Sequence, residues 1–111
     1  MNIEQARFNM IEQQIRPWDV LDPEVLELLH VVKRENFVPV AHKALAFVDA
    51  EIPLPGGEAM LMPKVEARLV QDVNVKKHEN VLEIGTGSGY MAAPATLTTA
   101  AARNNKWDDF M

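Results

Sequence analysis

Residues 80–90, with the sequence NVLEIGTGSGY, join an apolar run to three glycines at alternate positions. The aliphatic residues within 81–84 predict a buried β-strand. Gly85, Gly87 and Gly89 then permit a tight turn with backbone angles that other residues avoid. Ser88 can cap a helix that begins at Gly89 or Tyr90. The stretch therefore predicts a strand, a glycine loop and a helix N-terminus whose amide groups face one spot, which suits a ligand with a carboxylate or a polar sugar edge.

The spacing of the glycines separates the candidate ligands. A dinucleotide fingerprint would place its third glycine at Tyr90, and a phosphate-binding loop would need a lysine after Gly89. Glu83, two positions before the first glycine, repels a phosphate and attracts an ammonium group. An amino-acid ligand satisfies both features, although a strand-to-helix turn with glycines for close packing is the plain alternative. The pattern Glu-x-Gly-x-Gly-x-Gly resembles motif I of the Rossmann-like S-adenosylmethionine-dependent methyltransferases.

The composition is that of a globular protein with a single core. The 111 residues are 48% apolar and 24% charged. The net charge is −5 and no basic cluster exceeds two residues, which argues against a nucleic-acid partner. The absence of cysteine excludes thiolate chemistry, and His30, His42 and His78 lack the spacing of metal ligands, so no metal is expected. Neither a signal peptide nor a membrane-spanning run is found, so we expect a cytoplasmic protein with no membrane partner.

Hydrophobic periodicity predicts three amphipathic helices, over residues 2–15, 22–34 and 63–73. A proline lies in the first turn of the second and third helices, where it is favoured. Residues 35–39 are expected to be extended, and residues 40–46 to form a short helical or turn segment. The expected buried stripes are Ile3, Ala6, Met10, Ile11 and Ile15 in the first helix, Val25, Leu28, Leu29 and Val32 in the second, and Val65, Leu69, Val70 and Val73 in the third.

Residues 47–63 are rich in proline and glycine and predict a long irregular loop. A loop of this length in a compact domain is usually functional. All five glycines of the chain lie either at 56–57 or within 85–89. We therefore expect two ligand-facing surfaces, one on each of these loops.

Four segments in order are similar to bacterial protein-L-isoaspartate O-methyltransferases: residues 6–18, 34–39, 51–55 and 81–90. The resemblance extends from residue 1 to about residue 93. It implies an α/β fold, here a truncated Rossmann-like methyltransferase that is mostly helical. The N-terminal helices would be followed by the first strand and the glycine loop.

The implied activity is methyl transfer from S-adenosyl-L-methionine to a protein or peptide carboxylate, in most members the α-carboxyl of an isoaspartyl residue. By position in the motif, Gly85, Thr86, Gly87 and Gly89 would wrap the methionine part of the cofactor, and Glu83 would orient its amino group. The loop at 52–63 would cover the acceptor side.

The chain departs from the family at two places. Where the family has Thr-Ile-Ser in the acceptor loop, this chain has Ala59, Met60 and Leu61, so the hydroxyls that help hold a carboxylate are absent and the catalytic residues are unassigned. After Ala93 the resemblance stops, and Pro94 would interrupt the expected helix. We divide the chain accordingly: residues 1–62 form the helical region and Pro/Gly loop, 63–103 begin the cofactor-binding core, and 104–111 are an atypical tail. On this interpretation the chain is an incomplete N-terminal portion, inactive by itself.

A lone strand at 81–84 would leave both of its edges unpaired. The segment would then pair with another chain, pair with another segment of this chain, or not form a strand, and of these we predict a homodimer or other assembly through this region. The alternative function is that of a non-catalytic fragment, a helical module that associates with itself or binds a partner. The two hypotheses differ in one property, because only the methyltransferase needs to bind S-adenosylmethionine.

Overall fold

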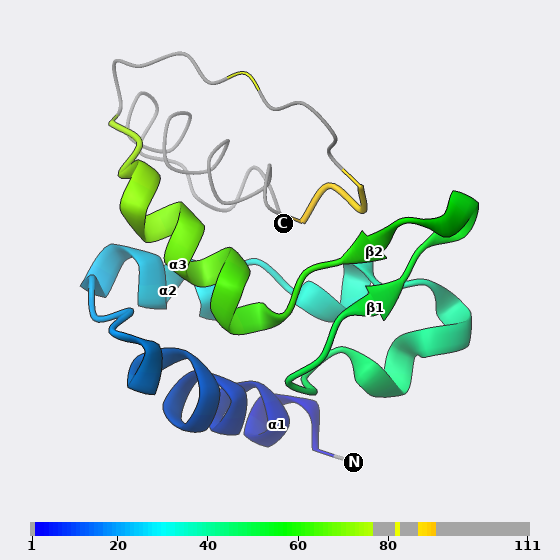
Figure 1. The fold of residues 1–111 in the computed structure, drawn as a ribbon. Helices are drawn as coiled ribbons and strands as arrows, with labels where there is room; N and C mark the ends of the chain where they lie inside the picture. Colours follow the sequence, from blue (N-terminus) through cyan, green and yellow to red (C-terminus); the bar gives the residue numbers. More distant parts are fainter. Residues whose placement is uncertain (1, 77–81, 83–86, 91–111) are drawn as a thin grey trace.

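The computed structural model describes residues 2–76, 82 and 87–90. Their elements in order are α1 (Ile3–Met10), η1 (Ile11–Ile15), η2 (Arg16–Trp18), α2 (Pro23–Val31), η3 (Arg34–Phe37), η4 (Val40–Leu45), β1 (Ile52–Pro53), η5 (Pro55–Gly57), β2 (Ala59–Met60) and α3 (Pro63–Val73). Figure 1 shows α1 on one side of α2 and α3, with the segment 87–90 on the other side and the β1–β2 hairpin at one end.

The first helical segment is longer than predicted. The side chain of Asn2 accepts a hydrogen bond from the amide of Gln5 at 3.0 Å and so caps α1. The chain then widens into the π-helical turn η1 and tightens into the 3₁₀ turn η2, which contains Pro17. Asp19 ends it in the left-handed conformation, with φ of 62°. Met10, Ile11 and Ile15 are buried as expected, but Ile3 is exposed because it lies in the first turn, beyond the core.

The second helix begins where it was predicted and ends earlier. Asp22 caps α2 by accepting a hydrogen bond from the amide of Glu24 at 2.9 Å. The predicted stripe is confirmed, because Val25, Leu28, Leu29 and Val32 are all buried. The helix ends at Val31, since Val32 is already extended. The expectation that residues 35–39 are extended is wrong for residues 35–37, which belong to the 3₁₀ turn η3. The 3₁₀ helix η4 confirms the short helical segment at 40–46.

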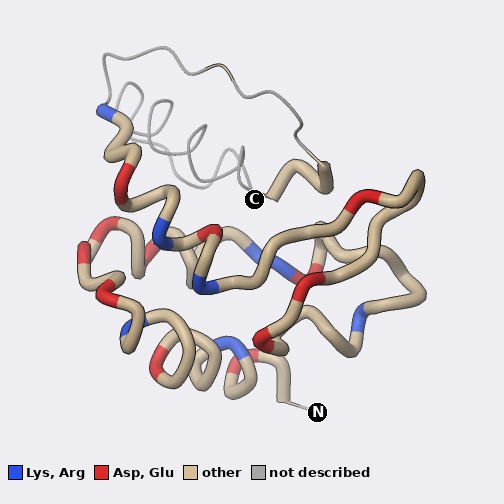
Figure 2. The backbone as a smooth tube through the Cα atoms, viewed as in Figure 1, with Lys and Arg blue, Asp and Glu red and all other residues tan. Residues whose placement is uncertain are grey.

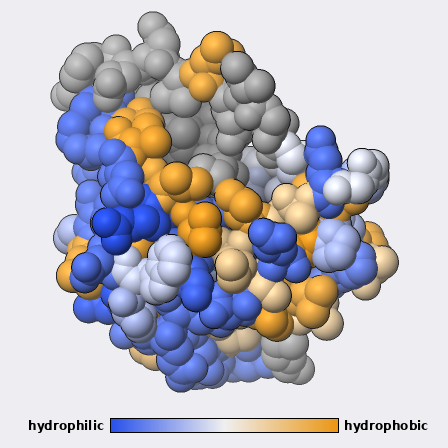
Figure 3. Space-filling model, viewed as in Figure 1, coloured by the Kyte–Doolittle hydropathy of each residue, from blue (hydrophilic) through white to orange (hydrophobic). Residues whose placement is uncertain are grey.

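The third helix has the predicted bounds but faces the core with a different side. Glu66 and Ala67 are buried, whereas Leu69 is 40% and Val73 is 63% exposed. Figure 3 shows apolar side chains along this part of the surface. The expected stripe is wrong for Leu69 and Val73, while Val70 packs against the core. The reason is that α3 packs against η1 and α2 with the face that brings the carboxylate of Glu66 to a buried arginine.

The predicted loop at 47–63 contains a small antiparallel hairpin. Ile52 of β1 lies opposite Met60 of β2, and both side chains are buried. Gly56 and Gly57 form its turn with φ of 84° and 82°, a conformation that glycine adopts without strain. The hairpin was not predicted, because two-residue strands carry too little alternation to be read from sequence.

Two core clusters share the inner face of the helices. One lies under the hairpin and consists of Leu28, Val32, Val38, Ala46, Ile52, Met60 and Tyr90. The other lies between η1, α2 and α3 and consists of Met10, Ile11, Ile15, Val20, Val25, Leu29 and Ala67. The first cluster therefore joins the hairpin to the end of the glycine loop.

Several predictions fall outside the described residues. They are the strand at 81–84 apart from Leu82, the helix after Tyr90, the tail at 104–111 and the pairing of the lone strand with another chain. In the part of the chain that the structure describes, helices predominate and the one sheet has two strands. None of the helices described there has the length and apolar character needed to span a membrane.

Candidate cofactor and acceptor site

The end of the glycine loop forms a turn at residues 87–90. Gly87 and Gly89 have φ of 58° and 84°, values that L side chains rarely adopt. The hydroxyl oxygen of Ser88 accepts from the amide of Tyr90 at 3.4 Å, so Ser88 bonds the backbone two residues on as a capping residue does. The turn confirms that glycine is needed at these two positions. Glu83, Gly85 and Thr86, the other predicted cofactor-binding residues, lie outside the described part of the chain.

The glycine loop contacts the Pro/Gly loop. A Cβ atom at Gly87 would lie 3.4 Å from Cδ1 of Leu54, whereas a Cβ at Gly89 would meet nothing within 4 Å. Gly87 therefore lies in close contact with the residue between β1 and η5, and Gly89 lies beside open space. The structure thus brings together the two loops that the sequence analysis singled out as ligand-facing.

Tyr90 anchors the turn in the core. Its side chain is buried, and its ring meets that of Phe37 edge to face with centroids 5.5 Å apart. The guanidinium carbon of Arg34 lies 4.9 Å from the centre of the Tyr90 ring. Burial raises the pKa of Tyr90 to about 12, although the positive charge of Arg34 opposes the shift. The phenol is therefore neutral at physiological pH and serves as an anchor.

Arg34 is the centre of what we call the Arg34 cluster: Arg34, Glu66, Tyr90 and the carbonyl groups of Ala46 and Leu61. The guanidinium donates to Glu66 Oε1 at 2.9 Å, to the Ala46 carbonyl at 2.8 Å and to the Leu61 carbonyl at 2.8 Å. The side chains of Arg34 and Glu66 are 1% and 5% exposed. A buried charge is tolerated only when it is paired and hydrogen-bonded, and this one is.

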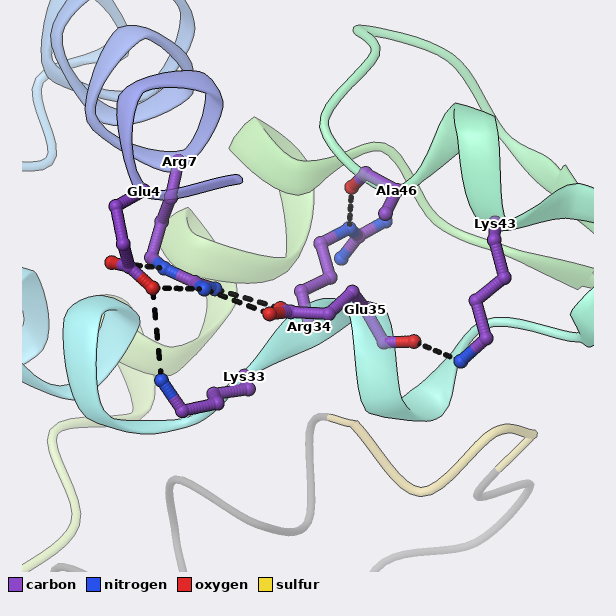
Figure 4. A network of polar contacts seen from close by, with 7 residues as sticks. All are labelled: Glu4, Arg7, Lys33, Arg34, Glu35, Lys43 and Ala46. Atoms are coloured by element: carbon purple, nitrogen blue, oxygen red, sulfur yellow. Dashed lines mark hydrogen bonds and ion pairs between the residues drawn. The ribbon is translucent and has the colours of Figure 1, made fainter. Parts of the chain in front are cut away.

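The second buried arginine forms the Arg7 cluster: Arg7, Glu4, Glu35 and the ring of Phe47. Figure 4 shows the guanidinium of Arg7 facing the carboxylate of Glu35, with two hydrogen bonds of 2.8 Å, while Glu4 bonds its other edge at 3.0 Å. Phe47 lies under the guanidinium at 5.3 Å. The hydrogen bonds from Arg7 hold the pKa of Glu35 and that of Glu4 below the ordinary value.

Both clusters meet in the 3₁₀ turn η3. Arg34 points toward Ala46, and the neighbouring Glu35 points toward Arg7, as Figure 4 shows. Lys43 also donates to the backbone carbonyl of Glu35, which fixes the turn from outside. The turn therefore connects α1 on one side to the two loops on the other.

Three positions of the Pro/Gly loop, Ala59, Met60 and Leu61, stand where the resemblance implies hydroxyl-bearing residues. Ala59 is exposed, Met60 is buried in the core, and Leu61 is half-buried with its carbonyl bound to Arg34. None of the three side chains can donate a hydrogen bond to a carboxylate. These three positions therefore present only backbone polar groups and apolar side chains.

Arg34, Glu66 and Tyr90 are the site residues that sequence reasoning missed. A charged residue next to an apolar stripe is most often exposed to solvent. The position of Arg34 just after the stripe that ends at Val32 therefore did not indicate that its side chain is buried. Glu66 lies between apolar positions of α3, and its bond to the buried Arg34 is a tertiary contact that no local pattern records. Tyr90 was identified only as a helix start.

The other features of the described chain offer no alternative site. A cavity of about 10 Å³ between α2, α3 and Tyr90 is lined mainly by apolar side chains and has room for no more than one water. Among the described residues no three His, Cys, Asp or Glu side chains gather as metal ligands. Figure 2 shows acidic and basic residues interspersed along the described backbone.

Comparison with known proteins gives a consistent result. Residues 5–102 match the family model described as Protein-L-isoaspartate(D-aspartate) O-methyltransferase. A protein-L-isoaspartate O-methyltransferase of Herpetosiphon aurantiacus is 39% identical over 90 residues, which are 81% of this chain and 40% of that protein. One from Rhodopseudomonas palustris is 42% identical over 84 residues, 76% of this chain and 38% of its own length. Protein-L-isoaspartate O-methyltransferase 2 of Pelobacter propionicus is 38% identical over 92 residues, 83% and 41% of the two chains. The chain thus spans about 40% of the length of these relatives.

Proposed function

The chain belongs to the protein-L-isoaspartate O-methyltransferase family, and from that premise we propose that it supplies the acceptor loop and part of the methyl-donor site of such an enzyme. The observation that carries the proposal is the family match over residues 5–102, which includes both loops. The contact between Gly87 and Leu54 supports it, since an enzyme of this kind needs donor and acceptor side by side. The alternative, a non-catalytic helical module, has no specific observation in its favour.

The described end of the glycine loop fits S-adenosyl-L-methionine. When bound, this cofactor supplies an electrophilic methyl group to a carboxylate oxygen. Gly87 and Gly89 hold a turn that only glycine adopts without strain, and the space beside Gly89 is open. Together with Glu83, Gly85 and Thr86, these residues would hold the methionine part through backbone groups and one carboxylate.

The contribution of the chain's own residues is mainly to position the reactants. A sulfonium methyl group is reactive enough that alignment accounts for most of the rate gain. Tyr90 anchors the glycine loop from within the core, and the buried side chains of Ile52 and Met60 fix the hairpin beside it. These contacts limit how far the two loops can move apart.

The acceptor is a protein carboxylate, and its finer identity is a separate proposal. Because Ala59 and Leu61 replace the hydroxyl-bearing residues of the family, a bound carboxylate has to find its hydrogen-bond donors in the backbone or in the rest of the enzyme. We propose isoaspartyl peptides as the first substrate to test. Methylation of an isoaspartyl peptide, but not of the matching aspartyl peptide, by a full-length protein with this N-terminal sequence supports that specificity. Equal methylation of both peptides contradicts it.

Binding of S-adenosylhomocysteine tests the cofactor site. Calorimetric titration of the chain is expected to show saturable binding. Gly89→Ala should weaken it at least tenfold, about 1.4 kcal/mol. Gly56→Ala is the matched control for backbone strain, because Gly56 has the same φ of 84° and equally open surroundings but lies in the loop assigned to the acceptor and not to the cofactor. Both variants carry a similar backbone strain of roughly 1–2 kcal/mol, so only the site variant should lose affinity. Equal affinity of the two variants, or no heat with the unmodified chain, contradicts the proposal.

Two expectations complete the proposal. The strand at 81–84 would pair with another chain and produce a homo-oligomer, and the protein would act in the cytoplasm. Light scattering at high concentration decides the first, since a monomer contradicts pairing. Cell fractionation decides the second.

A further inference from the structure

One side chain contacts both loops of the proposed site. The guanidinium of Arg34 donates to the carbonyl of Leu61, which follows β2 in the acceptor loop, and lies 4.9 Å from the ring of Tyr90 at the end of the glycine loop. Its other two bonds, to Ala46 and Glu66, fix it to the helical core. The two loops are thus held to a single planar group.

The geometry of this group is rigid. A guanidinium directs its N–H groups at fixed angles in one plane, whereas an ammonium is a rotatable point charge. The side chain is 1% exposed and the partner carboxylate of Glu66 is 5% exposed, so the bond between them is shielded from water. The direct links between the loops are apolar and have no directional preference: Leu54 lies against Gly87, and Tyr90 shares a core cluster with Ile52 and Met60.

We infer that Arg34 is a positioning residue, which sets the distance and angle between the acceptor loop and the glycine loop without touching either ligand. The assignment of the two loops to acceptor and cofactor rests on the proposed function, but the structural coupling between the loops does not. For a methyl transfer, a displacement of about 1 Å can lower the rate by about a hundredfold, so a rigid link between the two loops has a direct use.

Amide hydrogen exchange in the ligand-free chain tests the link. The amide of Leu54 donates to the carbonyl of Glu58 at 2.8 Å and reports opening of the hairpin turn. Tyr90→Leu removes the ring, while Tyr90→Phe keeps it. We expect Tyr90→Leu to accelerate exchange of the Leu54 amide about fivefold and Tyr90→Phe to accelerate it less than twofold. The amide of Ala6 in α1 serves as the reference and should exchange at the same rate in all variants.

The same two variants, made in an Arg34→Lys background, show whether Tyr90 affects the hairpin through Arg34. If Arg34 carries the coupling, Tyr90→Leu adds less than about twofold once the guanidinium is gone, because contacting residues are not additive. Equal acceleration in both backgrounds overturns the inference, because the coupling would then run through the apolar contacts of Tyr90 and Gly87 with the hairpin. An unchanged Leu54 rate in Tyr90→Leu overturns it as well.

A second measurement avoids any dependence on the folding of Arg34→Lys. The Nε–H group of Arg34, which donates to Ala46, should exchange faster in Tyr90→Leu along with the Leu54 amide. A constant Nε–H rate with a changed Leu54 rate overturns the inference.

Exchange in the presence of S-adenosylhomocysteine is a separate measurement from the ligand-free experiments. Addition of S-adenosylhomocysteine to the unmodified chain should slow exchange at both loops, and in Arg34→Lys at the glycine loop alone. A failure to bind removes the proposed function, while the ligand-free cycle still decides the role of Arg34.

Discussion

The Arg34 cluster and the Arg7 cluster each hold a guanidinium whose side chain is 1% exposed, yet their partners differ. Arg34 meets one buried carboxylate, two backbone carbonyls and an aromatic ring, whereas Arg7 meets Glu35 at 17% exposure and Glu4 at 68%. The partners of Arg7 can return to water if the arginine is lost, whereas Glu66, the carboxylate partner of Arg34, cannot. Two ion pairs of the same chemistry should therefore differ widely in how much stability depends on them.

The largest difference is expected for Arg34→Met. The change leaves the carboxylate of Glu66 and two carbonyls without the arginine, which costs about 3–5 kcal/mol of the free energy of unfolding. Urea denaturation followed by circular dichroism measures the loss. Adding Glu66→Leu should recover only part of it, because the carbonyls of Ala46 and Leu61 still lack their donor. Full recovery would show that the backbone bonds contribute nothing.

A smaller loss is expected for Arg7→Met. Because Glu35 is partly exposed and Glu4 largely so, their carboxylates can be rehydrated, and the loss should be about 1–2 kcal/mol. The double variant with Glu35→Leu should recover nearly all of it, since Arg7 donates to side chains alone among the hydrogen bonds described for it. If Arg7→Met costs as much as Arg34→Met in the same denaturation experiment, the comparison between the clusters is wrong.

The two clusters should also differ in pH dependence. The Arg7 hydrogen bonds lower the pKa of Glu35 below 4.5, so the stability they provide is present above that pH and is lost as the pH falls through the lowered value. Burial raises the pKa of Tyr90 to about 12 from 10.0, so stability is intact below pH 10 and falls as the pH rises toward 12. Denaturation across pH should show the acid loss reduced in Glu35→Gln and the alkaline loss reduced in Tyr90→Phe. Each variant serves as the control for the other, and an exchange of the two effects would contradict the assignment.

The smallest effect is expected for Glu4→Gln. Glu4 is largely exposed, and water can take its place at the edge of Arg7. The midpoint of urea denaturation should stay within the error of the measurement at physiological salt. A clear shift would indicate that the outer edge of the Arg7 cluster is not solvated as its exposure implies.

Much of the helical framework could be predicted from the sequence. The cap at Asp22, the position of Pro63 in the first turn of α3 and the stripe from Val25 to Val32 are local signals, and the structure confirms them. Which face of α3 is buried could not be predicted. Hydrophobic periodicity predicted that Leu69 faces the core, whereas the structure buries Glu66, which pairs with Arg34 from another part of the chain.

In the candidate site, too, local features could be predicted and tertiary contacts could not. The turn at positions 87 and 89 could be predicted from the spacing of the glycines, because glycine is the residue that adopts a positive φ without strain. The roles of Arg34 and Tyr90 depend on contacts 56 residues apart in the chain, and no local pattern records them.

The two clusters are joined by a single peptide bond, because Arg34 and Glu35 are adjacent in η3 and their side chains diverge. The order of the two residues therefore decides which charge faces each cluster. Exchanging them would set a guanidinium against Arg7 and a carboxylate against Glu66, so that an unchanged composition would replace two attractions with two repulsions.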